Sequence, residues 1–523
     1  MIMNTQQRKD WWSIWLTVSI ILILILALQP QVQAQPCSLS LSDPEQQPPS
    51  VFVPPPGNAS SASATTGGLR AIHFLHGLGG TATSWNMVAS RTAANGASQY
   101  PARQVVYAQP HTYIQNGDLS SMGLDVQSFL NTYGWALNQS HGLQAQRNII
   151  VTHSLGGAVA LALDSLNTLP NANHQAGGYI MFGTGFQGVH AAQSFSPYGD
   201  DLARAFIAEG CQVLSDPDVW AYHRLPNLRW LPNLDPVLRA ISDSLCQTTG
   251  QVLLPFTLKQ FDRPVIQELV PGAPMLDALV NRPTGGPTLA IYGVEDEPVF
   301  WRTATSMYTA DSVGLALASD PFSMDDDQAL VDWVQDEYDR FRIQQFALWQ
   351  SSQAAFLQSY HLGGKHLLGG WHFARGLSLQ RQSAAHGRVA QWYADANESY
   401  KQMIGARVIT SARDGYWCLC RNPMSSEMPV AITAIQDSSD CSTSDPDAEC
   451  FIYPRWVQTI QEKPNDGLVL AESAGLYPHA AATILMPGTN HQQMRNSSVT
   501  REVLKRIFNG QVPNGAFFIT APQ

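Results

Sequence analysis

The sequence predicts an α/β fold, in which a mostly parallel sheet carries helices on both faces. Short runs rich in Ile, Val and Phe alternate with stretches of helical length between about residues 69 and 182, and this alternation is typical of parallel sheets. The runs are apolar throughout, which indicates strands that are buried on both faces. Glycine-rich turns follow two of the runs, at the carboxyl edge where sites form in such sheets.

The expected elements follow one another in a regular order. The sequence predicts strands over 69–75, 104–108, 148–151 and 178–182, and helices from about 83, over 119–137 and over 155–166. The alternation lapses after residue 188, resumes with a strand over 288–292, lapses again until about residue 456 and closes with a strand over 481–486. We therefore expect one domain over 69–523, with two insertions at about 189–287 and 302–455 that cover the carboxyl edge as a cap or lid.

Composition places the chain among globular proteins and excludes one class of partner. Of its 523 residues, 44% are apolar and 14% are charged, which argues against extensive disorder. The net charge is −11, and no cluster of Lys and Arg is interleaved with aromatic residues. Because nothing here would hold a phosphate backbone, we expect no nucleic-acid partner.

The first 34 residues predict a secretory signal. Arg8 and Lys9 precede an apolar run over 11–28, and Val32-Gln33-Ala34 fits a cleavage site. An uncleaved membrane anchor is the alternative, because about 18 apolar residues just span a bilayer. Residues 35–68 are rich in Pro, Ser and Ala and predict a linker. We expect a secreted, extracellular or periplasmic protein.

Seven cysteines suit an exported chain, in which disulfides persist. An odd number leaves one unpaired. Local loops would be closed by pairing Cys211 with Cys246, and Cys418 or Cys420 with Cys441 or Cys450. A metal site at Cys418 and Cys420 is the other interpretation, but their spacing is one residue short of the usual zinc knuckle and no second pair of this kind follows. Disulfides are the favoured reading.

The strongest local pattern is Thr152-His153-Ser154-Leu155-Gly156-Gly157, between a strand and a helix of small residues. It has the form of a nucleophile elbow, a tight turn that demands small residues two places before and two places after the serine. Gly156 meets this demand, whereas Thr152 stands where glycine is usual. The turn would place Ser154 at a helix N-terminus, where free N–H groups stabilise negative charge.

Two further motifs supply the partners of such a serine. His76-Gly77-Leu78-Gly79-Gly80 ends the strand over 69–75, at the place of the second oxyanion donor. We assign the two donors to the backbone N–H groups of Leu78 and Leu155, and expect His76 to orient the loop by hydrogen bonds. His491 follows the last strand, where the general base belongs in the chain order serine, acid, histidine.

Two carboxylates fit the role of the acid. Asp296 follows the strand over 288–292, and Asp466 precedes a helical stretch and the last strand. We favour Asp466, because one helix and one strand then separate it from His491 and both would lie at adjacent strand ends. Asp296 would need the second insertion to loop out between acid and base.

Two charged or histidine-rich stretches of the second insertion receive structural interpretations. Asp325-Asp326-Asp327 opens a helical stretch over about 326–359 and predicts a solvated helix start. His361, His366 and His372 lie in a glycine-rich segment without carboxylates at ligand spacing, so we expect a mobile lid or packed loop that includes Trp371 and Phe373, and no metal.

Four motifs together resemble those of bacterial secreted lipases and esterases of the α/β-hydrolase superfamily: His76-Gly77-Leu78-Gly79-Gly80, Thr152-His153-Ser154-Leu155-Gly156-Gly157, Asn465-Asp466-Gly467-Leu468-Val469 and Asn490-His491. The resemblance implies Asp466 as the triad acid and His491 as the base. Some of those lipases bind calcium through an aspartate two residues after the histidine. Gln493 stands there, so calcium is not implied.

These motifs predict an exported serine hydrolase that cleaves carboxylic esters through Ser154, His491 and Asp466. We expect a small-molecule or lipid ester as substrate and no cofactor, and a lipid surface is a candidate contact. An amidase or glycolipid deacylase with the same triad remains an alternative, as does a hydrolase fold kept as a binding module.

Overall fold

The computed structural model describes most of the chain after residue 50: residues 51–52, 70–85, 88–92, 106–136, 139, 148–167, 176–194, 213, 216, 263–309, 328–361, 367–421, 431–442 and 449–508. The expected signal over 1–34 lies outside these residues, as do Cys37, Cys211, Cys246, His366 and the acidic run 325–327.

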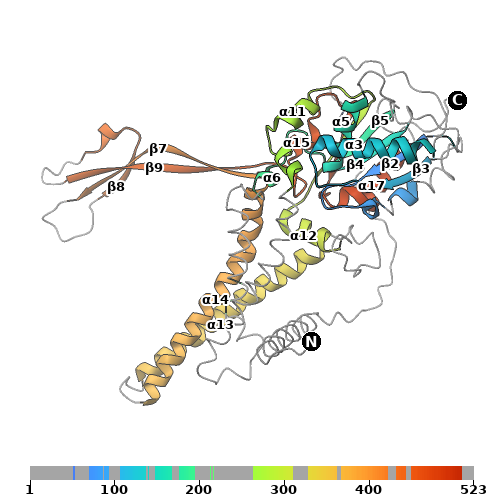
Figure 1. Ribbon diagram of the computed structural model, residues 1–523. Helices are drawn as coiled ribbons and strands as arrows, with labels where there is room; N and C mark the ends of the chain where they lie inside the picture. The colour runs from blue at the N-terminus through green and yellow to red at the C-terminus, as the bar shows by residue number, and fades with distance from the viewer. Residues whose placement is uncertain are drawn as a thin grey trace, which may run out of the picture. The chain divides into compact units, whose positions relative to one another are not determined.

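A seven-stranded sheet forms the core, in the order β1-β10-β6-β5-β4-β2-β3 (Figure 1). Every neighbouring pair is parallel except β1 with β10. The strands are β1 (Val51–Phe52), β2 (Arg70–Leu75), β3 (Val106–His111), β4 (Ile149–His153), β5 (Gly178–Phe182), β6 (Thr288–Val294) and β10 (Ala482–Pro487). The six parallel strands confirm the α/β prediction.

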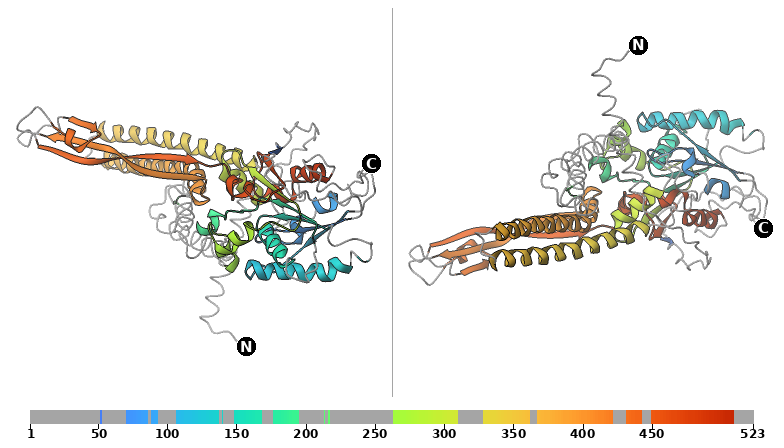
Figure 2. Two further views of the ribbon diagram at one scale, coloured as in Figure 1. Left: turned by 90° about the horizontal axis from the view of Figure 1, so that it is seen from above. Right: turned by 90° about the horizontal axis from the view of Figure 1, so that it is seen from below.

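Helices cover both faces of this sheet, and each face has its own apolar cluster. On one face, α3 (Leu119–Phe129), α5 (Leu155–Asn167) and α11 (Pro274–Val280) pack on Ile150, Met181 and neighbours. On the other face, η1 (Ala82–Trp85), the turn of helix after it and α17 (Ser498–Phe508) pack on Phe74, Val151 and neighbours. Figure 2 shows these two layers above and below the sheet. Coverage of both faces explains why the strands are apolar throughout.

Two core segments differ from the sequence prediction. The helix expected over 119–137 is α-helical only to Phe129 and continues as a π-helical turn, η2 (Leu130–Gly134). Within the expected linker, Val51 and Phe52 pair with Ile484 and Thr483 as an antiparallel edge strand. A two-residue strand leaves no apolar pattern long enough to recognise in a sequence.

The segment between β5 and β6 contributes short helices: α6 (His190–Ser194), α10 (Pro264–Glu268) and α11. Both α10 and α11 begin with a proline, whose fixed φ suits the first helical position. Val265, Ile266 and Leu276 of these helices join the apolar cluster beneath α5. This part of the first expected insertion therefore belongs to the packed core.

The segment between β6 and β10 begins with α12 (Val299–Thr309) and two long helices, α13 (Ala329–His361) and α14 (Leu367–Met403). Figure 2 shows α13 and α14 side by side, and we call this pair the hairpin. Phe341, Ala385 and Tyr393 lie in its buried seam. The prediction of a loop around His372 is wrong, because Trp371, His372 and Phe373 lie within α14. Glycines at 369, 370 and 376 concealed this helix in the sequence.

A separate antiparallel sheet follows the hairpin, and we call it the arm. It consists of β7 (Arg407–Arg421), β8 (Ala431–Ile435) and β9 (Glu449–Glu462), in the order β8-β7-β9, with the short η7 (Ser438–Asp440). The arm reaches residue 462, beyond the expected boundary at 455. Its strands escaped prediction because polar and apolar residues mix on both faces of β9, where no residue is buried.

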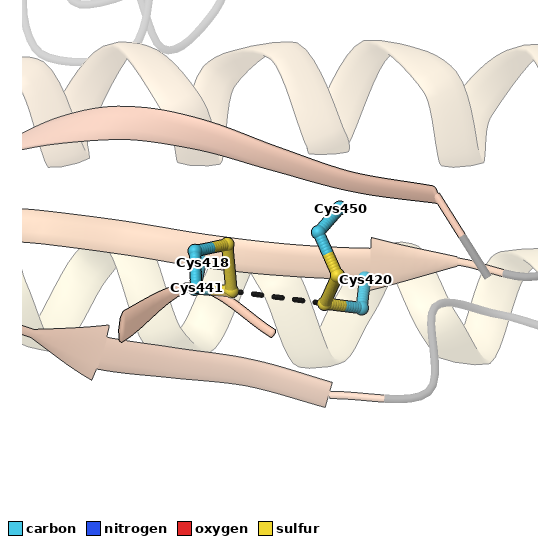
Figure 3. A group of neighbouring side chains, drawn as sticks. All are labelled: Cys418, Cys420, Cys441 and Cys450. Carbon is cyan, nitrogen blue, oxygen red and sulfur yellow. Dashed lines mark hydrogen bonds between the residues drawn. A yellow bond between two sulfur atoms is a disulfide. The ribbon is translucent and has the colours of Figure 1, made fainter. Parts of the chain in front are cut away.

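Two disulfides cross-link the arm, Cys418 to Cys441 and Cys420 to Cys450 (Figure 3). They decide between the pairings that the sequence left open. Cys418 Sγ lies 3.7 Å from Cys420 Sγ, and the four sulfur atoms lie within 4.8 Å of one another. All four are consumed in disulfides, which favours the structural interpretation over a metal site.

Buried charge joins the hairpin and the arm to the core. Lys401 of α14 is buried, and its Nζ lies 2.7 Å from Glu297 Oε1 after β6 and 3.0 Å from Glu462 Oε2 at the end of β9. Burial alone would lower the pKa of Lys401, but hydrogen bonds to these two carboxylates raise it above its ordinary value. After the hairpin and the arm, the chain also returns to the core close to the place where it left. The Glu295 amide there donates to the Asn465 carbonyl at 2.8 Å.

Candidate active site

Ser154 lies in the turn between β4 and α5, and its φ of 57° is the only positive value at a non-glycine residue that the structure describes. Its amide donates to the Phe182 carbonyl at 2.8 Å, and its carbonyl accepts from Gly157 at 3.0 Å. Left-handed backbone at a residue with a Cβ is strained and persists only where surrounding contacts impose it. This is the geometry of a nucleophile elbow.

The neighbours of Ser154 show why the elbow needs small residues. A Cβ on Gly156 would lie 2.7 Å from the His76 carbonyl oxygen, so only glycine allows β2 and α5 to approach so closely. Thr152, the departure from the usual pattern, is fully buried in β4. Its hydroxyl has no hydrogen-bond partner within the described residues. The core thus accommodates the threonine with its hydroxyl unsatisfied.

Asp466 and His491 form a buried pair, with His491 Nδ1 2.8 Å from Asp466 Oδ2. The other carboxylate oxygen of Asp466 accepts from the amides of Leu468 at 3.0 Å and Val469 at 2.7 Å. The His491 amide also donates to the Asp466 carbonyl at 2.7 Å. Three hydrogen bonds fix the position of the carboxylate, and the carboxylate in turn orients the imidazole through Nδ1.

Asp296, the alternative acid, lies at a different place. Its amide donates to the carboxylate of the neighbouring Glu295 at 2.8 Å, and its Oδ2 would lie 3.2 Å from a Cβ on Gly488. Among the described residues, Asp296 and His491 share no hydrogen bond or ion pair. The structure therefore brings Asp466 to His491, as the favoured hypothesis expected.

The second ring nitrogen of His491 is available for proton transfer. His491 Nε2 is buried and has no hydrogen-bond partner within the described part of the chain. Gly183, at the end of β5, faces this ring, since a Cβ there would lie 3.1 Å from His491 Nδ1. Phe182, the residue before it, accepts the hydrogen bond from Ser154. The end of β5 thus contacts both the elbow and the imidazole.

His153 forms a second connection between the elbow and His491. Its Nε2 lies 2.7 Å from the His491 carbonyl oxygen, so Nε2 carries the proton and donates, and the two rings lie 4.6 Å apart. Burial chiefly, then the neighbouring His491 and Arg495, holds the pKa of His153 well below its ordinary value. The residue next to Ser154 is therefore a neutral donor that fixes the backbone of His491. This role of His153 was not predicted, because the sequence offers no signal for it beyond the position beside the serine.

The predicted oxyanion donors lie on the two sides of the elbow. Leu155 is the first residue of α5, where helix geometry provides no acceptor for its N–H. Leu78 lies in the glycine-rich turn after β2, which a hydrogen bond from the Gly80 amide to the Gly77 carbonyl closes at 3.1 Å. A Cβ on Gly77 would lie 2.9 Å from Ser154 Cβ, so this turn packs against the serine.

Gln115 holds the glycine-rich turn in place. Its Oε1 accepts from the Gly79 amide at 2.7 Å, and its Nε2 lies 3.2 Å from the Gly80 carbonyl. Arg263 Nη1 donates to the same Oε1 at 2.7 Å. His76, expected to orient the loop, does contact the Gly77 carbonyl at 2.8 Å through Nδ1. Gln115 was not predicted, because nothing in its sequence context marks it.

Sequence comparisons give no relatives, whereas comparisons of structure give several. No family model matches, and no curated protein matches. The phospholipase PlaB from Legionella pneumophila is 14% identical over 45% of this chain and 41% of its own, with a TM-score of 0.28. An extracellular α/β-hydrolase from a Paenibacillus species is 14% identical over 43% of this chain and 77% of its own, with a TM-score of 0.22.

A third solved structure, the lipase BlEst2 from Bacillus licheniformis, is 16% identical over 50% of this chain and 81% of its own, with a TM-score of 0.24. This chain spans less than half of the phospholipase's length in the first match. The fold is identified from the sheet and the turn at Ser154, and not from these low similarities. A parallel sheet covered on both faces, with the strained Ser154 between β4 and α5, is the α/β-hydrolase fold.

Proposed function

We propose that this protein is a serine hydrolase that cleaves carboxylic esters, a lipase or esterase in its chemistry. One observation carries the proposal: a buried Asp466–His491 pair, with His491 Nε2 unengaged, is hydrogen-bonded to His153, the residue that directly precedes the strained Ser154. A serine, a histidine and an orienting carboxylate in this chain order are the components of acyl transfer.

In the first step, Ser154 Oγ attacks the ester carbonyl carbon and passes its proton to His491 Nε2. The tetrahedral intermediate carries its negative charge on the former carbonyl oxygen, where the amides of Leu78 and Leu155 donate. The bond to the leaving alcohol breaks, and His491 returns the proton to that oxygen. Asp466 stabilises the transient imidazolium without accepting its proton.

In the second step, water takes the place of the alcohol. His491 Nε2 removes a proton from water as its oxygen attacks the acyl carbon, and the bond to Ser154 Oγ breaks. The proton then returns to Ser154, and the acid is released. No cofactor is needed for either step.

Export belongs to the same proposal. Two disulfides in the arm suit an oxidising compartment, as does the expected signal over 1–34. The substrates would then be esters or lipids outside the cytoplasm.

Fluorophosphonate labelling tests the nucleophile. We expect one adduct on Ser154 in the folded protein and none in Ser154→Ala. A folded protein without an adduct would instead support a hydrolase fold kept as a binding module.

A substrate profile tests the bond that is cleaved. We expect hydrolysis of short- and long-chain esters with Ser154→Ala slower by at least about 10⁴-fold. Amide or glycolipid turnover with near-zero ester rates would favour the amidase or deacylase alternative.

A further inference from the structure

The outer half of the hairpin exposes large apolar side chains to a degree that the rest of the hairpin does not. We call residues 343–361 of α13 and 367–387 of α14 the hairpin tip. Eight large apolar residues in it are between 45% and 82% exposed: Ile343, Phe346, Trp349, Leu357, Tyr360, Trp371, Phe373 and Leu377. None of the exposed large apolar residues falls in the described remainder of α13 and α14.

Most of these side chains lie outside the seam between the two helices, whereas the ring of Phe373 lies 5.6 Å from that of Phe356 on α13. The seam of the tip is made by other residues, many of them small. Ser352, Ala355 and Ser359 are buried on α13, and Ser359 Oγ donates to the Gly369 carbonyl at 2.8 Å. Small residues let helices approach closely, so the tip is already packed while Trp349, Tyr360 and Trp371 stay exposed.

The charged residues of the hairpin tip are all positive. The chain carries 41 Asp and Glu among 523 residues, yet none lies between Arg340 and Ala394. Within the tip the charged residues are Arg375 and Arg381, and Lys365 stands in the connection between the two helices, outside the described residues. A chain of net charge −11 therefore ends this hairpin in a purely cationic, aromatic surface.

We propose that the hairpin tip docks on the surface of an anionic lipid bilayer. Trp and Tyr favour the boundary between headgroups and acyl chains, because their rings are apolar while their N–H and O–H groups stay hydrated. Trp349, Tyr360 and Trp371 are such side chains. Arg375, whose guanidinium lies 5.5 Å from the centre of the Trp371 ring, places a cation beside them. The absence of acids removes repulsion from anionic headgroups.

The tip docks at the surface and does not cross the membrane. Among the described helices, none is both long and apolar enough to span a bilayer. Polar residues such as Gln350, Gln353 and Gln358 interrupt the apolar positions of α13. An interfacial helix combines an apolar face of this kind with cations and low overall hydrophobicity.

Docking would bring the core to a membrane, and it deepens the proposed function by naming a lipid as its substrate class. The docking surface itself does not depend on Ser154, His491 or Asp466. Ser154→Ala should therefore bind vesicles as the wild type does while losing hydrolysis. Loss of one property without the other distinguishes failure of this proposal from failure of the catalytic one.

Tryptophan quenching by brominated lipid tests the contact at the tip directly. The full chain is mixed with vesicles of brominated phosphatidylglycerol, and Trp349→Phe/Trp371→Phe is compared with the wild type. Phenylalanine preserves the apolar surface and removes only the reporter. We expect the double variant to lose a measurable part of the quenching, and Trp135→Phe, an equally exposed core tryptophan, to lose none. Equal quenching in wild type and double variant would overturn the proposal.

Two further checks concern the charge of the lipid and the exposure of the hairpin tip in the absence of vesicles. Quenching at the tip should weaken several-fold in brominated phosphatidylcholine, and again when Arg375→Gln/Arg381→Gln removes the cations. Without vesicles, acrylamide should reach Trp349 and Trp371. If both are shielded in vesicle-free solution, another protein surface covers the tip, and the membrane proposal is wrong.

Discussion

The core sheet and the arm are both β-structure, but they bury their residues to opposite extents. Every residue of β4 and of β5 is buried, whereas β9 has no buried residue among its 14. The core strands hold their places by apolar packing on two faces. The arm relies on ladder hydrogen bonds, cross-strand pairs and two disulfides, because an isolated sheet of this size has little core of its own. Chemistry that needs fixed geometry therefore belongs to the core.

The largest expected effect tests whether Asp466, and not Asp296, is the residue that orients His491. Asp466→Asn should lower kcat by about 10⁴-fold, because an amide stabilises the wrong tautomer of His491. Asp296→Asn should stay within a few-fold of wild type. Ester hydrolysis at saturating substrate measures both, with circular dichroism as the folding control. A crippled Asp296→Asn would reverse the assignment.

The arm should respond to loss of a disulfide without affecting the core. Cys418→Ser/Cys441→Ser opens a link between residues 23 apart, which corresponds to about 3 kcal/mol of stability. Trypsin should then cut the arm, at Arg413 or Arg455, much faster than in the wild type. Hydrolysis of a soluble ester should be unchanged, and a parallel loss of activity would break the distinction between the two regions.

Acid should weaken the core through His73. Burial, with a smaller contribution from His111, lowers the pKa of His73 to about 4. The unfolded chain, with a pKa near 6.5, therefore binds the proton more readily. Stability is full above pH 6.5 and falls as the pH drops towards 4, by roughly 2–3 kcal/mol from this group. Neither ring nitrogen of His73 has a partner within the described residues, so leucine can replace it.

Thermal denaturation between pH 7.5 and 4.5 measures this effect. His73→Leu should lose less stability on acidification than the wild type does. Identical pH profiles would show that His73 is not a source of the acid sensitivity.

The smallest effect concerns the position of the glycine-rich turn. Gln115→Leu removes the acceptor of the Gly79 amide and a donor to the Gly80 carbonyl. Leu78 then loses its fixed place, and we expect kcat to fall by about tenfold, less than the loss of an oxyanion donor itself. KM should change little, and fluorophosphonate labelling should slow in parallel. An unchanged kcat would mean that the turn holds its shape alone.

The core was predictable from sequence because burial dictates its residues. The strand over 178–182 has the predicted bounds, and β2 and β4 begin within one residue of theirs. Ser154 could be recognised because the elbow constrains several adjacent residues at once. The pairing of Asp466 with His491 followed from chain order, as neighbouring strand ends bring residues together.

The rest could not be predicted, for two different reasons. The arm and α14 lack a periodic apolar pattern, because little of the arm is buried and glycines interrupt α14. Gln115 acts through hydrogen bonds to Gly79 and Gly80, and His153 through one to the His491 carbonyl, and all these backbone atoms are far away in sequence. Such contacts place no demand on neighbouring residues, so no motif surrounds them.

The bond from the Glu295 amide to the Asn465 carbonyl has a consequence for how this protein can be altered. The bond shows that the segment from residue 296 to residue 464 leaves the core and returns to it at neighbouring places. Because the two ends already touch, a few residues could join them at little entropic expense. The insertion can therefore change in length without moving the strands of the core, provided that the contacts of its base with the core are kept, such as the hydrogen bond from the Tyr400 hydroxyl to the Gly467 carbonyl.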